Sequence, residues 1–302
     1  MNRIVVSFTG QNGLTSTCDA CGFTQTGGAE HVELNDRYAG RCCPACLAVR
    51  TVHLDAGGDE INAINYRLDQ RLALYRARHY EFESRYRATW KFISRHLINP
   101  AERILEVGSN TGALVEFLGR TADAKITSVE RNSTLAAHQR TKGLDCHTSV
   151  DDIGEQTRFD VIILMDVLEH VVKCAELLAS LRCRLTKDGL IFLQFPNSGS
   201  LAARRARTRW SWWEAPDHVH HFRTESMTHL AAASGCRIEA LRTVSPLLDD
   251  LDAVLPSGPG SRILHKVNGY IALNRLITIG VGHSGSLIQV LLSNNVEGSI
   301  VV

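Results

Sequence analysis

The sequence predicts an α/β protein in which a parallel sheet flanked by helices follows a small metal-binding ribbon and a helical linker. Two observations predict this class. Strand-like and helix-like runs alternate after residue 100, and paired cysteines lie within the first 50 residues. Alternation of this kind is typical of a parallel sheet that is covered by helices.

The alternation consists of short apolar runs that are bounded by glycine, proline or polar residues. Helical stretches separate these runs. The expected strands are residues 103–107, 125–130, 146–150, 160–166, 189–196, 237–244 and 286–293.

The amino-terminal segment, residues 1–50, holds five of the nine cysteines. Two C-x2-C knuckles supply four thiolates, Cys18, Cys21, Cys43 and Cys46, with the spacing of a tetrahedral zinc site. Cys42 is an alternative to Cys43, but it would lengthen the second spacing, so we expect Cys43. Four thiolates leave no position for water, which predicts a structural Zn²⁺ ion rather than a catalytic one. The alternative is a set of free thiols in a flexible tail.

Residues 51–100 are expected to form a helical linker or lid, because apolar residues recur at threes and fours between 59 and 97. Pro100 closes this stretch.

Charge and composition exclude several classes of protein. The chain has 302 residues, with 33 Lys and Arg against 32 Asp and Glu, so it lacks the positive excess of a protein that coats nucleic acid. A hydrophobic content of 44% excludes wholesale disorder. No apolar run approaches the roughly 20 residues of a membrane-spanning helix. The first residues do not resemble a secretory signal, so we expect a cytoplasmic location.

A glycine-rich loop at residues 108–112 follows the first expected strand and precedes a helical run. Glycine lets the backbone approach a nucleotide closely, and Glu130 ends the next strand, where a carboxylate can accept both hydroxyls of a ribose. The loop lacks the G-x-G-x-x-G pattern, and the acidic Glu106 stands just before it. These features disfavour NAD and favour a ligand with a cationic end, such as S-adenosylmethionine.

The segments 106–112 and 159–171, together with Glu130, resemble class I S-adenosylmethionine-dependent methyltransferases. The runs 166–171 (DVLEHV) and 193–197 (LQFPN) are similar to the quinone and small-molecule branch. The resemblance implies a Rossmann-like seven-stranded methyltransferase sheet with the last pair of strands reversed. The corresponding domain would span residues 101–302, with an insertion at 245–285.

The resemblance also implies the residues that bind the cofactor. The methionine end of S-adenosylmethionine would be held by Glu106, Gly108, Ser109, Asn110 and Gly112. The ribose would be held by Glu130. Asp151 would lie near the adenine, and Met165 would line the pocket of the methyl group. The G-S-N-x-G form of the loop is similar to deoxysugar C-methyltransferases, which also carry an amino-terminal zinc domain with paired knuckles.

Two histidines are candidates for proton transfer. His170 follows the strand at 160–166, at the edge where open α/β sheets bind ligands. His218 begins a segment with three histidines in four residues, and imidazole is suited to proton transfer near neutral pH. His218 also occupies the place of a histidine in the resembled sugar enzymes, so we expect it to be the general base. The alternative is a packed or surface imidazole, which we favour for His220 and His221.

The stretch 204–213 contains four arginines and three of the four tryptophans. Arginine forks and tryptophan faces suit an anionic, planar substrate. The alternatives are contact with RNA or with an anionic membrane, or an amphipathic helix whose tryptophans complete the core.

The sequence therefore predicts a methyltransferase with S-adenosylmethionine as cofactor and a structural zinc ion. It would methylate a carbon or oxygen atom of a small metabolite, and anionic metabolites are among the candidate substrates. One alternative is an RNA or protein methyltransferase that recognises its substrate through the zinc ribbon, although the balanced charge disfavours nucleic acid. Another is a scaffold that binds S-adenosylmethionine without catalysis. A homodimer is left open.

Overall fold

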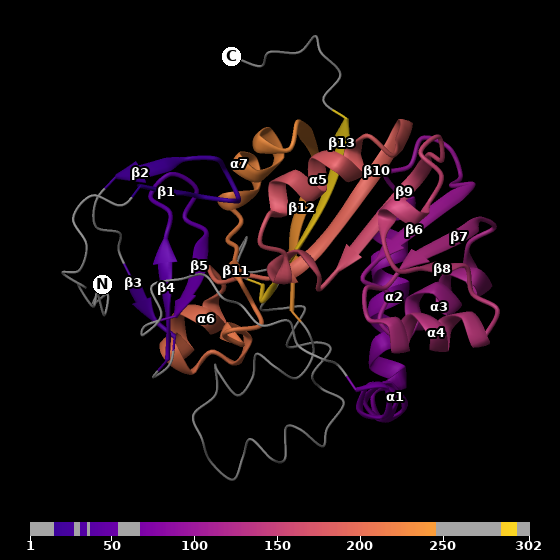
Figure 1. Ribbon diagram of the computed structural model, residues 1–302, viewed down its shortest axis with the longest axis horizontal. Coiled ribbons are helices and arrows are strands. Elements are labelled where there is room, and N and C mark those ends of the chain that lie inside the picture. Colours follow the sequence, from indigo (N-terminus) through magenta and orange to yellow (C-terminus); the bar gives the residue numbers. More distant parts are fainter. Residues whose placement is uncertain (1–14, 27–30, 35–36, 54–66, 246–284, 295–302) are drawn as a thin grey trace.

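The computed structural model describes residues 15–26, 31–34, 37–53, 67–245 and 285–294. A central sheet lies between layers of helices, and a smaller ribbon lies beside one end of it (Figure 1). The insertion expected at 245–285 falls outside the described residues except at its two ends.

The central sheet has seven strands in the order β12-β13-β10-β9-β6-β7-β8. These strands are β6 (Arg103–Val107), β7 (Lys125–Val129), β8 (Cys146–His147), β9 (Phe159–Met165), β10 (Leu185–Pro196), β12 (Cys236–Val244) and β13 (Leu287–Asn294). The first five of them in chain order are parallel, whereas β13 is antiparallel to both β10 and β12. The last two strands therefore stand in reversed spatial order, and the predicted methyltransferase sheet is confirmed.

Two strands differ in length from the sequence-based expectation by more than one residue. β8 ends at His147, because Ser149 caps a 3₁₀ turn, η1 (Val150–Asp152), that begins at Val150. β10 begins at Leu185, because that residue already pairs with Phe159 before a register shift at Leu190. Both departures arise from local pairing and capping that the apolar pattern does not encode.

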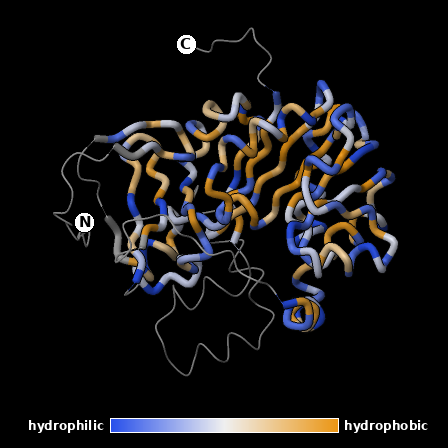
Figure 2. The backbone as a smooth tube through the Cα atoms, viewed as in Figure 1, coloured by the Kyte–Doolittle hydropathy of each residue, from blue (hydrophilic) through white to orange (hydrophobic). Residues whose placement is uncertain are grey.

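Both faces of the sheet are buried, as expected for a parallel sheet between helices. The helices after the linker are α3 (Ala113–Thr121), α4 (Ser133–Thr141), α5 (Cys174–Arg182), α6 (Leu201–Ala206) and α7 (Ser226–Ala233). One core cluster joins the sheet to α5, α7 and the ribbon, and a second joins it to α2 and α3. The sheet strands are correspondingly the most hydrophobic part of the backbone in Figure 2.

The linker forms two helices, α1 (Leu68–Ala77) and α2 (His79–Ser94), which meet at Arg78. Tyr86, Thr89 and Ile93 of α2 are buried, so this helix belongs to the core of the molecule. No helix in the described part of the chain has both the length and the apolar character needed to span a bilayer.

The ribbon contains β1 (Thr15–Thr17), β2 (Thr24–Thr26), β3 (His31–Glu33), β4 (Tyr38–Cys42) and β5 (Val49–His53). β1 and β2 form a hairpin, and β3, β4 and β5 form an antiparallel sheet. A further strand, β11 (His220–His221), comes from the segment after His218. It pairs with β5 and forms one edge of the sheet that contains β3, β4 and β5. Ala20, Cys46 and Ala48 of the ribbon lie within the main core cluster. The ribbon is thus packed into the rest of the molecule.

Candidate active site

The glycine-rich loop connects β6 to α3 at the carboxyl edge of the central sheet. Gly108, Asn110 and Gly112 have the positive φ angles 77°, 52° and 80°. A Cβ atom at Gly108 would lie 2.5 Å from Cγ2 of Val167, and one at Gly112 would lie 2.8 Å from Cδ1 of Leu144. Both glycines are therefore required by the backbone and by the packing of the loop.

Two acidic side chains flank this loop. Glu106 on β6 is 5% exposed, and its Oε2 atom has no hydrogen-bond partner among the described residues. Burial raises the pKa of Glu106 well above its ordinary value, and the negative charge of Glu130 adds to the effect. Glu130 accepts hydrogen bonds from the backbone N–H groups of Asn110 (2.7 Å) and Asn132 (2.8 Å). A buried acid with an unused oxygen is suited to a cationic group.

A fully buried glutamine, Gln139, forms hydrogen bonds with the glycine-rich loop. Gln139 on α4 donates from Nε2 to Oγ of Ser109 and to the carbonyl of Asn110, each at 2.8 Å. Its Oε1 accepts a hydrogen bond of 2.9 Å from Ser128. Gln139 was not predicted as a site residue, because its position in a helical run carries no sequence signal for contact with the loop.

Two further cofactor residues predicted from the resemblance belong to other elements than the loop. Met165 is half-buried at the end of β9, in register with Gln194 of β10. Asp151 is exposed in η1, where its backbone N–H donates to Oγ of Ser149 at 3.1 Å. The structure thus brings Glu106, the loop and Glu130 together, while the roles of Asp151 and Met165 stay predictions.

We expect Gly108→Ala to weaken the binding of S-adenosylmethionine by at least about tenfold, because the added Cβ would displace the Val167 side chain and strain the left-handed loop. Gly119→Ala on α3 is the matched control, since no atom lies within 4 Å of its Cβ position. Calorimetric titration measures the affinity of both variants. Equal affinities would remove the loop from the binding site.

The predicted catalytic histidines lie together at the same edge of the sheet. The rings of His170 and His218 are 4.8 Å apart between centroids. Nδ1 of His218 lies 2.8 Å from the Trp212 carbonyl, and Nδ1 of His170 lies 2.8 Å from the Asp217 carbonyl. A carbonyl only accepts, so both Nδ1 atoms carry a proton and both Nε2 atoms keep a lone pair. Burial lowers the pKa of each imidazole, which favours the neutral form that a general base needs.

Two carboxyl groups that sequence reasoning did not assign adjoin these histidines. Oε2 of Glu214 lies 3.4 Å from Nε2 of His218. Glu169 is 1% exposed, and neither of its carboxyl oxygens has a hydrogen-bond partner in the described part of the chain. One carboxyl oxygen of Glu169 and one ring nitrogen each of His170 and His218 lie within 4.8 Å of one another, a spacing that would admit a metal ion. The adjacency of Glu169 to His170 in sequence was the available signal.

Burial is the main cause that raises the pKa of Glu169 well above its ordinary value, and the charge of Asp166 contributes next. The protonated, neutral form of Glu169 is therefore favoured in this cluster.

The linker helices reach this edge of the sheet. Arg85 of α2 donates to Asp166, which follows β9, at 2.9 Å, and Gln194 donates to the other oxygen of Asp166 at 3.0 Å. Arg71 of α1 is close enough to Glu130 and Asp217 to lower the pKa of both, although burial is the larger cause and raises them. Arg71 of α1 thus interacts electrostatically with Glu130 beside the loop and with Asp217 in the histidine segment.

The four predicted metal ligands converge in the ribbon. The Sγ atoms of Cys18, Cys21, Cys43 and Cys46 all lie within 4.8 Å of one another. The Cys18–Cys46 and Cys21–Cys43 pairs are each 3.7 Å apart. A tetrahedral zinc site with Zn–S bonds of about 2.3 Å has an S–S edge of about 3.8 Å, so the arrangement fits this metal.

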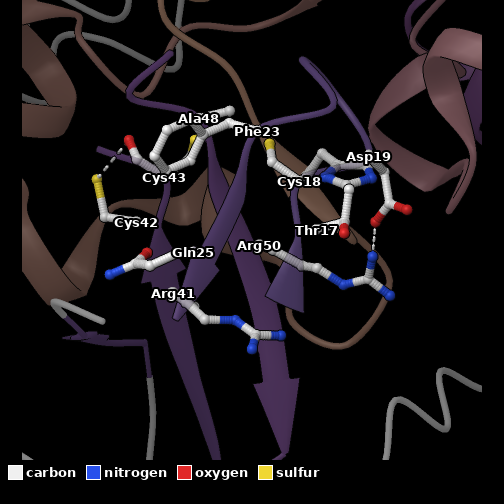
Figure 3. A pocket seen from close by; sticks show the side chains of 11 residues that line it. Thr17, Cys18, Asp19, Phe23, Gln25, Arg41, Cys42, Cys43, Ala48 and Arg50 are labelled. Carbon is white, nitrogen blue, oxygen red and sulfur yellow. Dashed lines mark hydrogen bonds and ion pairs between the residues drawn. The ribbon is translucent and has the colours of Figure 1, made fainter. Parts of the chain in front are cut away.

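Cys42 is directed away from this cluster. Its thiol donates to the carbonyl of Cys43 at 3.9 Å, and Figure 3 shows it on the side of a surface hollow that is lined by both residues. On the other side of the hollow Arg50 pairs with Asp19, which lies inside the first knuckle. The choice of Cys43 over Cys42 agrees with this geometry.

The arginine and tryptophan stretch divides into a packed and an exposed part. Trp210 is buried against Ala202 and Ala203 of α6. The four arginines are exposed: Arg204, Arg205, Arg207 and Arg209. The Trp213 ring lies 4.8 Å from the ring of His221, which joins this stretch to the histidine segment. The tryptophans therefore contribute to packing, and the arginines face solvent near the candidate site.

The chain was compared with known protein families and with solved structures. Residues 76–241, more than half of the chain, match the family described as "Methyltransferase domain". The chain is similar to a chain from the complex between the Haloferax volcanii Trm112 methyltransferase activator and a candidate methyltransferase, with a TM-score of 0.52 and 10% identity. That match covers 76% of this chain and 99% of the other, and it shows the shared fold alone.

Two curated relatives are named ubiquinone biosynthesis O-methyltransferase. The one from Bradyrhizobium diazoefficiens is 28% identical over 102 residues, 32% of this chain and 40% of the relative. The one from Actinobacillus pleuropneumoniae serotype 5b is 28% identical over 142 residues, 36% of this chain and 60% of the relative. The chain thus spans about half the length of the curated relatives that it matches. The predicted enzyme class is confirmed, and the chain belongs to the methyltransferase domain family.

Proposed function

We propose that this protein transfers a methyl group from S-adenosylmethionine to a carbon or oxygen atom of a small metabolite, with His218 as general base and a structural zinc ion in the ribbon. The observation that carries the proposal is the pairing, at one sheet edge, of a glycine loop flanked by buried acids with two neutral imidazoles. The buried acids beside the loop suit a cationic nucleoside, and the imidazoles suit removal of a proton from the acceptor.

The residues present fit S-adenosylmethionine. The unused Oε2 of Glu106 would take the ammonium group of the methionine end, and the loop from Gly108 to Gly112 would pack against it. Glu130 already accepts two backbone N–H groups, and its remaining lone pairs would accept the ribose hydroxyls. The bound cofactor supplies a methyl group that is activated by the sulfonium.

The histidine segment would prepare the acceptor. Nε2 of His218 is the unprotonated nitrogen and would take the proton from a hydroxyl or from a carbon beside a carbonyl. Glu214 lies 3.4 Å from that nitrogen and would stabilise the imidazolium that forms. His170, whose Nε2 also keeps a lone pair, stands next to it and would orient the acceptor.

The exposed positive charge near the candidate site and the names of the curated relatives both bear on the substrate class. The exposed arginines at 204, 205, 207 and 209 favour an anionic acceptor, including a nucleotide-linked one. The names of the curated relatives favour oxygen as the methylated atom. Incubation with labelled S-adenosylmethionine and a panel of catechols, phenolic acids and nucleotide-linked keto sugars would separate these acceptors. Label that enters only RNA or protein would support the alternative methyltransferase class.

We expect Glu106→Gln to weaken the binding of S-adenosylmethionine by more than about tenfold while stabilising the ligand-free protein at alkaline pH. Because the pKa of Glu106 is raised in the folded state, ionisation destabilises the fold as pH rises above the ordinary value of 4.5. The variant should therefore match the wild type in stability near pH 4 and exceed it at pH 8.

Thermal unfolding at both pH values and calorimetry at pH 8 measure these two effects. Glu116→Gln is the control, since Glu116 lies on the neighbouring α3 and pairs at the surface with Lys142. Unchanged affinity in Glu106→Gln would contradict the assignment of the cationic end to this residue.

A further inference from the structure

Besides the pairing of β5 with β11, a buried threonine of the zinc ribbon contacts the catalytic segment. Thr51 on β5 is 1% exposed and lies among residues 218–221, far along the chain. Its Oγ1 donates to the His218 carbonyl at 2.6 Å, and its backbone N–H donates to the Val219 carbonyl at 2.8 Å. The same Oγ1 lies 2.9 Å from Nε2 of His221. One ribbon residue thus binds three groups of the segment that starts with His218.

The roles in this contact are fixed by hydrogen-bond chemistry. The His218 carbonyl can only accept, so the single proton of the Thr51 hydroxyl is used there. The hydroxyl oxygen must then accept a hydrogen bond from the Nε2–H group of His221. The pKa of His221 is lowered well below its ordinary value by burial, so its ring is neutral and has one N–H to give. Every polar group at this junction is matched only when a hydroxyl stands at residue 51.

The opposite side of the same backbone is held by the turn that follows β9. The N–H of Val219 donates to the Glu169 carbonyl at 2.7 Å. The peptide that follows His218 is therefore clamped between the ribbon and the turn after β9, η2 (Leu168–His170). With this backbone fixed, the His218 ring keeps its 2.8 Å contact from Nδ1 to the Trp212 carbonyl, which leaves the lone pair on Nε2.

Other contacts tie both zinc knuckles to the same body. Ser226, at the start of α7, donates to the Cys46 carbonyl at 2.9 Å. The thiol of Cys174, at the start of α5, donates to the carbonyl of Asp19 at 3.4 Å. The ribbon that carries Thr51 is thereby fixed against two helices that cover the sheet.

We infer that Thr51 is a positioning residue for His218, and that through this residue the zinc ribbon is a structural part of the catalytic centre. The inference rests on the proposed role of His218 as the base. Thr51 acts on the backbone and leaves the ring nitrogen free for the acceptor.

Thr51→Val tests this role, because it keeps the shape of the side chain and removes the hydroxyl. The readout is the tautomer pattern of His218 in ¹H–¹⁵N spectra of the 302-residue chain labelled at its 13 histidines. The His218 signals are assigned by their loss in His218→Gln. We expect the wild type to show the Nδ1–H tautomer and Thr51→Val to show a mixture with the Nε2–H form. Thr51→Ser, which restores the hydroxyl, should recover the wild-type pattern.

Thr89→Val is the matched control, since Thr89 is buried on α2 and its hydroxyl accepts from Gln289 at 3.3 Å. Thr89→Val should lower stability without changing the His218 signals. The affinity for S-adenosylmethionine should stay within about twofold of wild type in Thr51→Val, Thr51→Ser and Thr89→Val. If Thr51→Val does not fold, Thr51→Cys, a weak donor of similar size, should give an intermediate pattern. A wild-type His218 pattern in folded Thr51→Val or Thr51→Cys would overturn the inference. The tautomer is read without an acceptor, so a failure of the proposed base would be seen separately, as turnover that survives in His218→Ala.

Discussion

Replacing His218 with alanine is expected to reduce methyl transfer by about 10²–10⁴-fold while leaving the affinity for S-adenosylmethionine unchanged. The acceptor would lose its proposed base, and His170, whose ring centroid lies 4.8 Å from that of His218, would stand too far from the position of the lost nitrogen to replace it fully. The cofactor residues would keep their geometry, since Glu106, the glycine loop and Glu130 are held by β6, α4 and backbone N–H groups instead.

Transfer of labelled methyl to the acceptor identified from the panel measures this loss, and calorimetry measures the affinity. His229→Ala is the matched control, because His229 is an exposed histidine on α7. It should retain full activity. Turnover near the wild-type rate in His218→Ala would remove this residue from the mechanism, and parallel loss of cofactor binding would make its role structural.

Replacing Cys43 with serine is expected to abolish stoichiometric zinc binding and to unfold the ribbon. Zinc contributes about 10–16 kcal/mol to the folding of small thiolate domains, far more than the apolar contacts of a few short strands. Loss of the ribbon would also expose part of the main core cluster, to which Cys46 and Ala48 belong. The midpoint of thermal unfolding should therefore fall steeply.

Cys42→Ser is the control for this experiment, because the neighbouring thiol lies outside the cluster. It should retain one zinc ion per chain and the stability of the wild type. Elemental analysis of purified protein and thermal unfolding with and without a chelator measure both properties. Retention of zinc in Cys43→Ser, or loss of it in Cys42→Ser, would contradict the assigned ligand set.

Local sequence patterns were sufficient to place the strands of the central sheet approximately and to identify the glycine-rich loop, whereas the order of the strands followed from the family resemblance. β6 occupies the residues expected from its apolar run, and Gly108 and Gly112 adopt the left-handed backbone that a tight strand-to-helix loop needs. The cysteine spacing predicted the thiol cluster, because two C-x2-C turns each direct two thiols to one point. In each case the determining interactions are near in sequence or follow from burial on both faces of a strand.

Contacts between distant segments could not be predicted in this way. Thr51 and His218 meet because β11 joins the ribbon sheet, and a two-residue strand leaves no periodic signal. Gln139 on α4 donates a hydrogen bond to Ser109 of the loop, although a glutamine in a helical run would ordinarily be expected to face solvent. The unpartnered carboxyl of Glu169 depends on how completely the turn after β9 is buried. Such features follow from tertiary packing and not from local pattern.

Calorimetric titration of the 302-residue chain with S-adenosylmethionine tests the central claim most directly. The proposed site predicts saturable binding of one molecule per chain, with an affinity that increases as pH rises toward the elevated pKa of Glu106, because the ionised carboxylate holds the cationic end. Absence of binding at millimolar ligand, in protein that is folded and loaded with zinc, would contradict the proposed function in both its catalytic and its non-catalytic forms.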